Sequence, residues 1–375
     1  MQQNNMQAKE LLQPSQTTPI CQHFGICGGC RFQDWAKDKY EEYKLSLLKQ
    51  KFTEKNINIK IDKLIEGQLH ARRRVTFHAH NQNNNFIFGF FKKKSHELFE
   101  IKECPISVPA IENNIKILRQ IAALFSANKP IDITVIQAEN GLDVTISKVQ
   151  NLTDQKRFQL VKFAEMSDIL RITVNQELII KKENIYIKVN NDLITFPPGV
   201  FLQATYVSQQ QMIEITIDWL RKQKNIVDLF SGIGTFSLPM SYFSSIDAFD
   251  SDENALKSLQ IAANNIKGIK KISTSVRDLF KRPLVIKELQ PYDGLIIDPP
   301  RAGSIEQIVE IAKSNIPKLV VISCNYLTLV RDIEILLKGG YKIEKTIAID
   351  QFLYSEHLEV MILLSKEKKK KKWTL

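Results

Sequence analysis

The second half of the chain alternates short apolar runs with longer segments in which apolar residues recur at helical spacing. Short apolar runs predict buried strands, and helical spacing predicts amphipathic helices. The sequence therefore predicts strands over 226–229, 246–249, 271–274, 294–297, 318–322, 341–348 and 358–364, and helices over 205–222, 254–265, 305–314 and 327–337. Strands that alternate with helices in this way are typical of a doubly wound, mostly parallel sheet. Ligands bind such sheets at the carboxyl ends of the strands.

The first half of the chain mixes both patterns. Helical spacing covers 35–54 and 111–125, and strand-like segments cover 74–80, 86–91, 131–137, 143–147, 169–174, 178–180 and 185–189. Asn140-Gly141 separates two of these strands and is a strong signal for a hairpin turn. The first half is therefore predicted to be a mixed α+β domain.

Pro197-Pro198-Gly199 interrupts the chain between the two patterns. We place a domain boundary there, with an α+β domain over 21–195 and an α/β domain over 196–365. Residues 1–20 are polar and offer little to bury, so we expect a flexible tail. Residues 366–375 contain the lysine run 368–372 and predict a basic tail.

Composition adds an expectation about partners. The chain of 375 residues contains 52 Lys and Arg against 41 Asp and Glu, a formal net charge of +11. This excess of positive charge favours an anionic partner, although basic proteins without an anionic partner are also common. No apolar run approaches the length of a membrane-spanning helix, and the first residues lack the apolar stretch of a secretory signal. We expect a cytoplasmic monomer that does not bind membranes.

Four of the five cysteines lie in the first half. Cys21, Cys27 and Cys30 fall in a short glycine-containing stretch, and Cys104 follows much later, just before Pro105. Four thiolates can complete a tetrahedral metal site. The uneven spacing and the closing Cys-Pro favour an iron–sulfur cluster over zinc. The alternative is that the cysteines are small buried residues without a metal.

A glycine-containing loop follows the first strand of the second half. Gly232 and Gly234 let the backbone approach a ligand, and Asp250 ends the next strand, where a carboxylate can bind ribose hydroxyls. This pairing suits a nicotinamide dinucleotide and S-adenosylmethionine equally. Asp298-Pro299-Pro300 follows a later strand and is typical of adenosylmethionine-dependent methyltransferases, although a stiff turn is the simpler interpretation.

Two further residues are placed at the same sheet edge. Cys324 follows strand 318–322 and is a candidate nucleophile, with a packed core cysteine as the alternative. Glu359 begins the last strand and is a candidate general base, with an exposed strand carboxylate as the alternative.

In order and combination these segments resemble the RNA uracil-5-methyltransferases, in particular the iron–sulfur branch that modifies 23S rRNA. The resemblance covers 21–364 and rests on Cys-x5-Cys-Gly-Gly-Cys with Cys104, Asp298-Pro-Pro-Arg-x-Gly, Ser-Cys324-Asn and Phe-x-x-Ser-x-His-x-Glu359. Tyr326 and Leu353 stand where the family usually has proline. Only 20 residues precede Cys21, so we expect the family's small N-terminal barrel to be absent.

The resemblance implies a Rossmann-like class I methyltransferase domain that binds S-adenosyl-L-methionine. Cys324 would attack C6 of a uridine as the nucleophile, and Glu359 would remove the C5 proton. The resemblance assigns two ligand sets: Gln203, Phe230, Gly232, Asp250 and Asp298 for the methyl donor, and Cys21, Cys27, Cys30 and Cys104 for a 4Fe-4S cluster.

The predicted partner is RNA, with 23S rRNA as the target and the T-loop of tRNA as the alternative. Basic residues on both sides of the aromatic segment 86–91 are candidate RNA contacts: Arg72, Arg73, Arg74, Lys92, Lys93 and Lys94. A solvated basic hairpin is the alternative interpretation.

Three other functions are less consistent with the motifs. Amino-group methyltransferases favour an aromatic residue after Pro-Pro, where this chain has Arg301. Some cytosine-5 methyltransferases place their cysteine in the loop after the fourth strand, where this chain has none. A non-catalytic iron–sulfur RNA-binding protein would not need Cys324 and Glu359.

Overall fold

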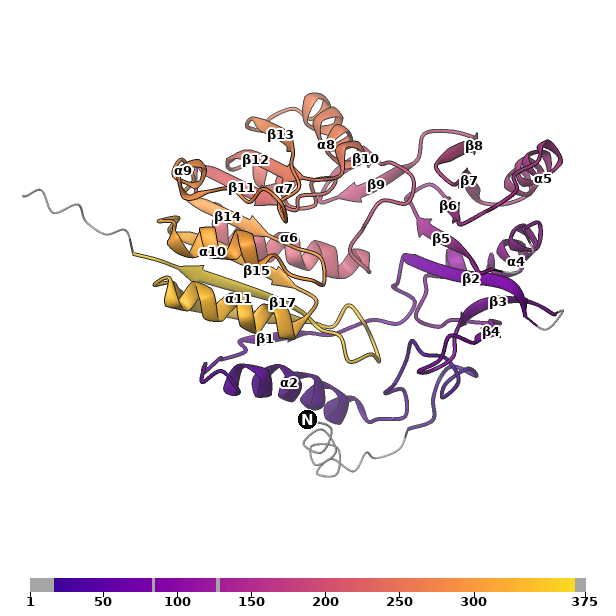
Figure 1. Ribbon diagram of the computed structural model, residues 1–375, viewed down its shortest axis with the longest axis horizontal. Helices are drawn as coiled ribbons and strands as arrows, with labels where there is room; N and C mark the ends of the chain where they lie inside the picture. Colours follow the sequence, from indigo (N-terminus) through magenta and orange to yellow (C-terminus); the bar gives the residue numbers. More distant parts are fainter. Residues whose placement is uncertain (1–16, 83–84, 126–128, 368–375) are drawn as a thin grey trace, which may run out of the picture.

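The computed structural model describes residues 17–82, 85–125 and 129–367 (Figure 1). The apolar runs of the second half form an eight-stranded sheet in the order β1-β16-β17-β15-β14-β11-β12-β13. Its strands are β1 (Lys63–Ile65), β11 (Asn225–Leu229), β12 (Ser245–Asp250), β13 (Ile272–Val276), β14 (Gly294–Ile297), β15 (Lys318–Ser323), β16 (Lys342–Ile349) and β17 (Glu359–Ser365). β17 runs antiparallel to both of its neighbours, and all other pairs are parallel. The predicted doubly wound, mostly parallel sheet is confirmed.

Helices cover both faces of this sheet (Figure 1). One face packs against α6 (Tyr206–Leu220), α7 (Ser237–Ser241) and α8 (Glu253–Asn265). The other face packs against α2 (Lys37–Thr53), α9 (Ile286–Leu289), α10 (Ile305–Lys313) and α11 (Tyr326–Lys338). Successive residues of a strand point to opposite faces, so Ile226 packs in the first core and Val227 in the second. Both faces are therefore apolar, which explains the continuous apolar runs.

A second sheet has seven strands in the order β4-β3-β2-β5-β6-β7-β8. They are β2 (Arg74–Gln82), β3 (Asn85–Phe91), β4 (Leu98–Glu100), β5 (Ile131–Gln137), β6 (Leu142–Ser147), β7 (Ile169–Val174) and β8 (Glu177–Lys181). Its core includes α3 (Pro109–Glu112), α4 (Ile115–Ala123) and α5 (Asp154–Glu165). β5 and β6 pair antiparallel on either side of Asn140-Gly141, as predicted.

The predicted helix 111–125 is two helices, α3 and α4, separated at Asn113 and Asn114. The Asn114 side-chain amide donates to the Ala110 carbonyl at 2.8 Å. Short amide side chains compete with the helical backbone in this way, which explains why the apolar spacing continues while the helix breaks.

The structure differs from the predicted domain boundary near residue 195. α2 and β1 lie within 21–195 in the sequence, yet β1 pairs with β16 and α2 packs beside α11. The hairpin of β9 (Tyr186–Val189) and β10 (Asp192–Thr195) also packs against the α6–α8 face of the large sheet. The large sheet is therefore built from both halves of the chain, because β1 covers the open edge of β16.

Most of the two predicted tails, residues 1–16 and 368–375, lies outside the described residues, and this includes the lysine run 368–372. None of the helices in the described ranges is long and apolar enough to cross a membrane.

Candidate functional site

The loop between β11 and α7 has the tight backbone that its glycines predict. Phe230, Gly232 and Gly234 all have positive φ, at 63°, 53° and 88°. A Cβ on Gly234 would lie 2.4 Å from Leu259 on α8, whereas a Cβ on Gly232 would meet nothing within 4 Å. Asp250, at the end of β12, accepts a hydrogen bond from the Gly232 N–H at 2.8 Å. The loop is thus anchored to α8 and β12 and faces open space at Gly232.

An aromatic pair lies beside this loop. The rings of Phe230 and Phe280 have centroids 5.5 Å apart, and Phe280 is exposed. Phe280 was not predicted as a site residue, although its place in the loop after β13, at the carboxyl edge of the sheet, was an available signal. Flat apolar rings at this edge can pack against a heterocyclic ligand.

Carboxylates gather where β11, β12 and β14 end. Asp228 is fully buried on β11, and its Oδ2 accepts from the Ser237 hydroxyl at 2.6 Å. Burial, together with the charges of Asp298 and Asp250, raises the pKa of Asp228 to about 7, against the hydrogen bond from Ser237. Burial likewise raises the pKa of Asp298 to about 7, against a hydrogen bond from Gln203. This negative edge suits a ligand that carries positive charge.

Cys324 lies at the turn from β15 into α11 and is half-buried. Asn325 caps α11 by accepting from the Leu327 N–H at 3.1 Å, and its amide donates to the Arg301 carbonyl at 2.9 Å. The cysteine turn is therefore fastened to the Asp298-Pro-Pro-Arg loop. Burial raises the pKa of the Cys324 thiol to about 12, with further contributions from the charges of Glu359 and Asp298. Three candidate residues are thus brought together at one edge.

Glu359, the first residue of β17, is only 3% exposed. Its Oε2 accepts a hydrogen bond from Gln351 Nε2 at 2.5 Å, and its Oε1 has no hydrogen-bond partner among the described residues. Burial and the charge of Asp298 raise the pKa of Glu359 well above its usual value, and the Gln351 hydrogen bond opposes this. Such a carboxylate takes up a proton more readily than an exposed one.

Gln203 connects the two acidic residues. Its Nε2 donates to Asp298 Oδ2 at 2.8 Å, and its Oε1 accepts from Gln351 Nε2 at 3.1 Å. The sequence placed Gln203 at the site but assigned no role to Gln351. Gln351 could have been noticed from its place beside the Phe-x-x-Ser-x-His-x-Glu signature.

The prediction that Arg73 contacts RNA is wrong. Arg73 is buried, its Nε donates to the Gln203 carbonyl at 3.2 Å, and its Nη2 donates to Gln209 Oε1 at 2.6 Å. The guanidinium therefore holds the Gln203 backbone from inside the protein. Arg72 is half-buried and lies over the Phe352 ring, 5.7 Å from its centroid.

The other basic candidates differ in accessibility. Arg74 is half-buried, with its Nε enclosed and without a hydrogen-bond partner among the described residues. Lys92 forms an ion pair with Glu97, whereas Lys93 and Lys94 are exposed. Exposure of these two lysines meets one requirement for RNA contact, and their role stays a prediction.

The four cysteines of the first half are free and half-buried. Burial, together with the charges of Cys104, Cys27 and Cys21, raises the pKa of Cys30 to about 12. The fold therefore brings Cys104 into electrostatic contact with three cysteines some eighty residues earlier. Within the described ranges, no three His, Cys, Asp or Glu side chains are arranged to hold a single metal ion.

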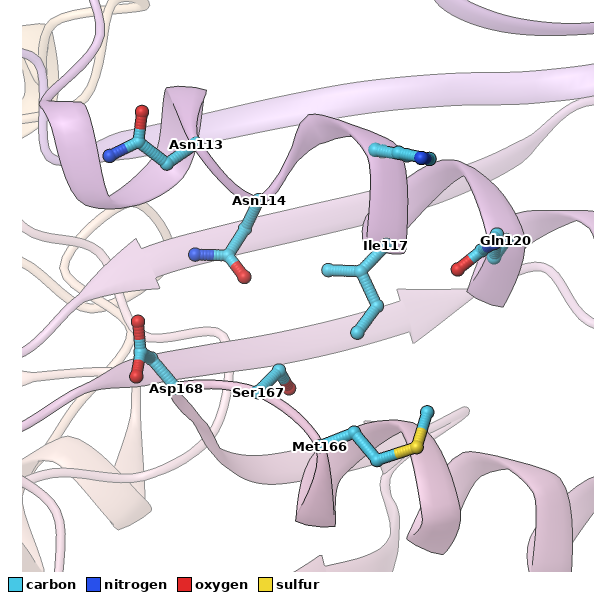
Figure 2. A pocket seen from close by; sticks show the side chains of 8 residues that line it. Asn113, Asn114, Ile117, Gln120, Met166, Ser167 and Asp168 are labelled. Atoms are coloured by element: carbon cyan, nitrogen blue, oxygen red, sulfur yellow. The ribbon is translucent and has the colours of Figure 1, made fainter.

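A hollow in the surface lies elsewhere, on the helical side of the seven-stranded sheet (Figure 2). Residues between α3 and α4, in α4 and directly after α5 line it: Asn113, Asn114, Lys116, Ile117, Gln120, Met166, Ser167 and Asp168. None of the candidate site residues is among them, so the chemistry of the protein is not expected there.

Comparisons with known proteins agree with this geometry. Residues 36–367 match the family described as tRNA (Uracil-5-)-methyltransferase. An uncharacterized RNA methyltransferase of Brucella suis biovar 1 (strain 1330) is 38% identical over 354 residues, which cover 94% of this chain and 85% of the relative. The 23S rRNA (uracil(1939)-C(5))-methyltransferase RlmD of Histophilus somni (strain 129Pt) is 27% identical over 370 residues, with 95% and 83% covered.

One solved structure shares the fold over most of its length. The tRNA (uracil-54, C5)-methyltransferase of Pyrococcus abyssi, in complex with S-adenosyl-L-homocysteine, has a TM-score of 0.69. It is 20% identical, and the match covers 90% of this chain and 86% of that one. Because the family match extends from α2 to beyond the last strand, the chain belongs to the tRNA (uracil-5-)-methyltransferase family.

Proposed function

We propose that the protein transfers a methyl group from S-adenosylmethionine to C5 of a uridine in RNA, through a covalent bond between Cys324 and C6. The observation that supports this most strongly is the convergence of Cys324, Glu359 and Asp298 at the carboxyl edge of the large sheet. A thiol next to a buried carboxylate supplies a nucleophile and a base, which are the two groups that the reaction needs.

The β11–α7 side of this edge fits the methyl donor. Asp250 is placed to accept from ribose hydroxyls, Phe230 and Phe280 offer rings to an adenine, and the open space at Gly232 admits the ligand close to the backbone. The donor supplies a methyl group on a positively charged sulfonium, which the carboxylates of Asp228 and Asp298 would attract. The Pyrococcus abyssi structure, which contains S-adenosyl-L-homocysteine in a related fold, supports this choice of donor.

The cysteine must first lose its proton. Once it is a thiolate, Cys324 attacks C6 of the uracil, and the electrons of the C5–C6 double bond move to form an enolate through O4. C5 then takes the sulfonium methyl, and the sulfur of the donor keeps the electron pair of the broken S–CH3 bond. Because stacked bases hide both faces of the ring, the uridine must leave its stack to reach Cys324.

Glu359 completes the reaction. Its free Oε1 accepts the proton from C5, the electrons of that C–H bond re-form the C5–C6 double bond, and the Cys324 sulfur leaves C6. The raised pKa of Glu359 makes it basic enough for this step. The enzyme then regains its starting state once Glu359 releases the proton.

We propose that the four cysteines of the first half would hold an iron–sulfur cluster. Cys21, Cys27, Cys30 and Cys104 act on one another electrostatically, and a cluster of four irons is larger than a single ion, so its ligands lie farther apart. When bound, the cluster supplies covalent links between the N-terminal loop and the segment before α3. The protein residues that shape the site include Gly29, whose N–H donates to the Cys27 sulfur at 3.4 Å.

23S rRNA is the proposed target. The relative from Histophilus somni, similar over nearly the whole chain, is named for that RNA. The T-loop of tRNA is the second candidate, because the Pyrococcus abyssi neighbour is named for uracil 54 of tRNA.

Two variants test the chemistry with labelled methyl donor and transcripts of both RNAs. Cys324→Ala removes the nucleophile, so we expect no methyl transfer and no covalent RNA complex, while donor binding measured by calorimetry is kept. Glu359→Gln leaves the nucleophile but removes the proton acceptor, so a methylated protein–RNA adduct accumulates on a denaturing gel. Full turnover by either variant contradicts the role of the substituted residue. A wild-type protein that binds RNA but transfers no methyl group supports the alternative of a non-catalytic RNA-binding protein.

A further inference from the structure

Gln351 is a buried glutamine whose side-chain amide makes three hydrogen bonds. Nε2 donates to Glu359 Oε2 at 2.5 Å and to Gln203 Oε1 at 3.1 Å, and Oε1 accepts from the Ala204 N–H at 3.1 Å. A primary amide has two N–H hydrogens and one oxygen, so both hydrogens are used. The backbone N–H of Ala204 can only donate, which fixes the orientation of the amide.

This orientation determines which oxygen of Glu359 can receive a proton. Because Gln351 presents a hydrogen to Oε2, a proton on Oε2 would face the amide hydrogen. Oε1 is buried and has no hydrogen-bond partner among the described residues. The carboxylate therefore has one oxygen that is held and one that is free to react.

The same amide joins Glu359 to the other side of the site. Gln203, which accepts from Gln351, donates in turn to Asp298 Oδ2 at 2.8 Å, and Arg73 holds the Gln203 carbonyl. Gln203 Nε2 and Gln351 Nε2 each donate to one of the two carboxylates, so these two hydrogen bonds favour the ionised form of Asp298 and Glu359 and oppose the effect of burial.

We propose that Gln351 is a positioning residue for the general base: it holds Glu359 Oε2, so that Oε1 faces the reacting C5 and accepts its proton. This inference rests on the proposed function of Glu359. It predicts that Gln351 affects release of the adduct and has little effect on its formation, because adduct formation needs Cys324 and the methyl donor.

The backbone around Gln351 does not depend on its amide. The neighbouring Asp350 is held by Lys44 at 2.5 Å and by the Tyr40 hydroxyl at 2.6 Å. A substitution that keeps the volume of Gln351 is therefore expected to leave the loop in place. Gln351→Met removes both donors, and Gln351→Asn keeps an amide that is one methylene too short.

Gln307 provides a matched control. It is also fully buried, and its amide holds the Leu284 backbone through two hydrogen bonds of 2.8 and 3.1 Å. Neither of these hydrogen bonds involves a candidate site residue. Gln307→Met therefore removes a comparable buried amide and reports the effect of lost stability alone.

The experiment separates formation of the adduct from its release in the full-length protein. RNA transcribed with 5-fluorouridine traps the adduct, because fluorine at C5 cannot leave as a proton does. On this RNA, wild type, Gln351→Met, Gln351→Asn and Gln307→Met should form adduct at similar rates. On uridine RNA, release by both Gln351 variants should be about tenfold slower at neutral pH.

The pH dependence tests the proposed mechanism directly. The hydrogen bond from Gln351 lowers the pKa of Glu359, so its loss raises that pKa and a higher pH is needed to ionise the base. The release profile of the Gln351 variants should move upward by about one pH unit. That of Gln307→Met should not move.

Three outcomes are informative. The inference is overturned if the pH profile of adduct release by Gln351→Met coincides with that of wild type. It is also overturned if Gln307→Met slows release as much as Gln351→Met does and the pH profile of Gln351→Met does not shift. Absence of adduct in the wild type on 5-fluorouridine RNA overturns the proposed function itself, which distinguishes the two failures. Melting temperatures of all variants show which of them are folded.

Discussion

At the scale of single residues, burial raises the pKa of the candidate nucleophile Cys324 and of two acids, Asp298 and Glu359. The pKa of Cys324 is raised to about 12, so its thiol is neutral near neutral pH. The burial of Cys324 therefore opposes the ionisation that the proposed attack on uracil requires. The charge of Arg301, which lowers this pKa, and the arrival of a cationic donor act in the opposite direction.

This balance predicts slow alkylation of Cys324 in the free protein. The thiolate is the reactive form, so its alkylation rate should rise about tenfold for each pH unit from neutral to about pH 10. Site-resolved mass spectrometry after brief iodoacetamide treatment measures it. A rate that is already independent of pH at neutrality would show that Cys324 is ionised at rest and would contradict the electrostatics described above.

The residues at the site that could be predicted from the sequence are those that follow strands. Cys324, Asp298 and Asp250 come directly at or after the ends of β15, β14 and β12, and parallel strands bring these ends to one edge. The contacts that Arg73 and Gln351 make with Gln203 could not be derived from the sequence. Their roles depend on Gln203, which is 130 residues from Arg73 and 148 from Gln351 along the chain.

At the scale of elements, the segment between β16 and β17 is held by a helix from the start of the chain. Lys44 on α2 donates to Asp350 Oδ1 at 2.5 Å, and both side chains are almost completely buried. Tyr40 on the same helix donates to Asp350 Oδ2 and accepts from the Tyr354 N–H. α2 therefore fixes the residues on either side of Gln351.

Lys44→Met should destabilise the protein by about 3–5 kcal/mol, because it leaves the Asp350 carboxylate buried without its ion pair. Urea denaturation followed by circular dichroism measures the change. The double variant with Asp350→Asn should recover part of the loss, since the unpaired charge is gone. Lys39→Met, which removes the exposed pair with Glu42, serves as control and should have a much smaller effect. Equal effects of the two lysine variants would contradict this role of α2.

Most elements follow from local patterns, and the exceptions have local causes. The apolar runs of β14 and β15 predict buried strands because helices cover both faces. β1 and β4 have only three residues each, too short for a pattern to be recognised. β1 forms because β16 offers it a parallel edge, and the paired residues, such as Lys63 and Ile347, lie far apart in the chain.

At the scale of the whole molecule, segments far apart in the sequence, β1 and β11–β17, build one sheet, and the cysteine loop contacts the segment before Glu359. The Arg31 N–H, next to Cys30, donates to the Tyr354 carbonyl at 2.7 Å, and Arg31 forms an ion pair with Glu356. The cysteine loop, α2 and the segment before Glu359 therefore lie together (Figure 1). The predicted division at residue 195 would separate parts that share a core.

A fragment of residues 196–375 should consequently not unfold cooperatively. It lacks β1 and α2, whose Leu48 and Phe52 are buried in the second core of the sheet. Each such side chain contributes about 1.5–3 kcal/mol on burial, a large part of the stability of a typical domain. Urea denaturation of the fragment and of the full chain tests this. If the urea midpoint and slope of the fragment equal those of the full chain, the predicted domain boundary near residue 195 is supported.

The central claim is that the protein makes 5-methyluridine in RNA. The most direct measurement is nucleoside mass spectrometry, with site mapping, of 23S rRNA and tRNA from cells with and without the gene, complemented by wild type or by Cys324→Ala. We predict that one 5-methyluridine in 23S rRNA disappears with the gene and returns with wild type but not with Cys324→Ala. An unchanged set of 5-methyluridines in both RNAs, or restoration by Cys324→Ala, would contradict it.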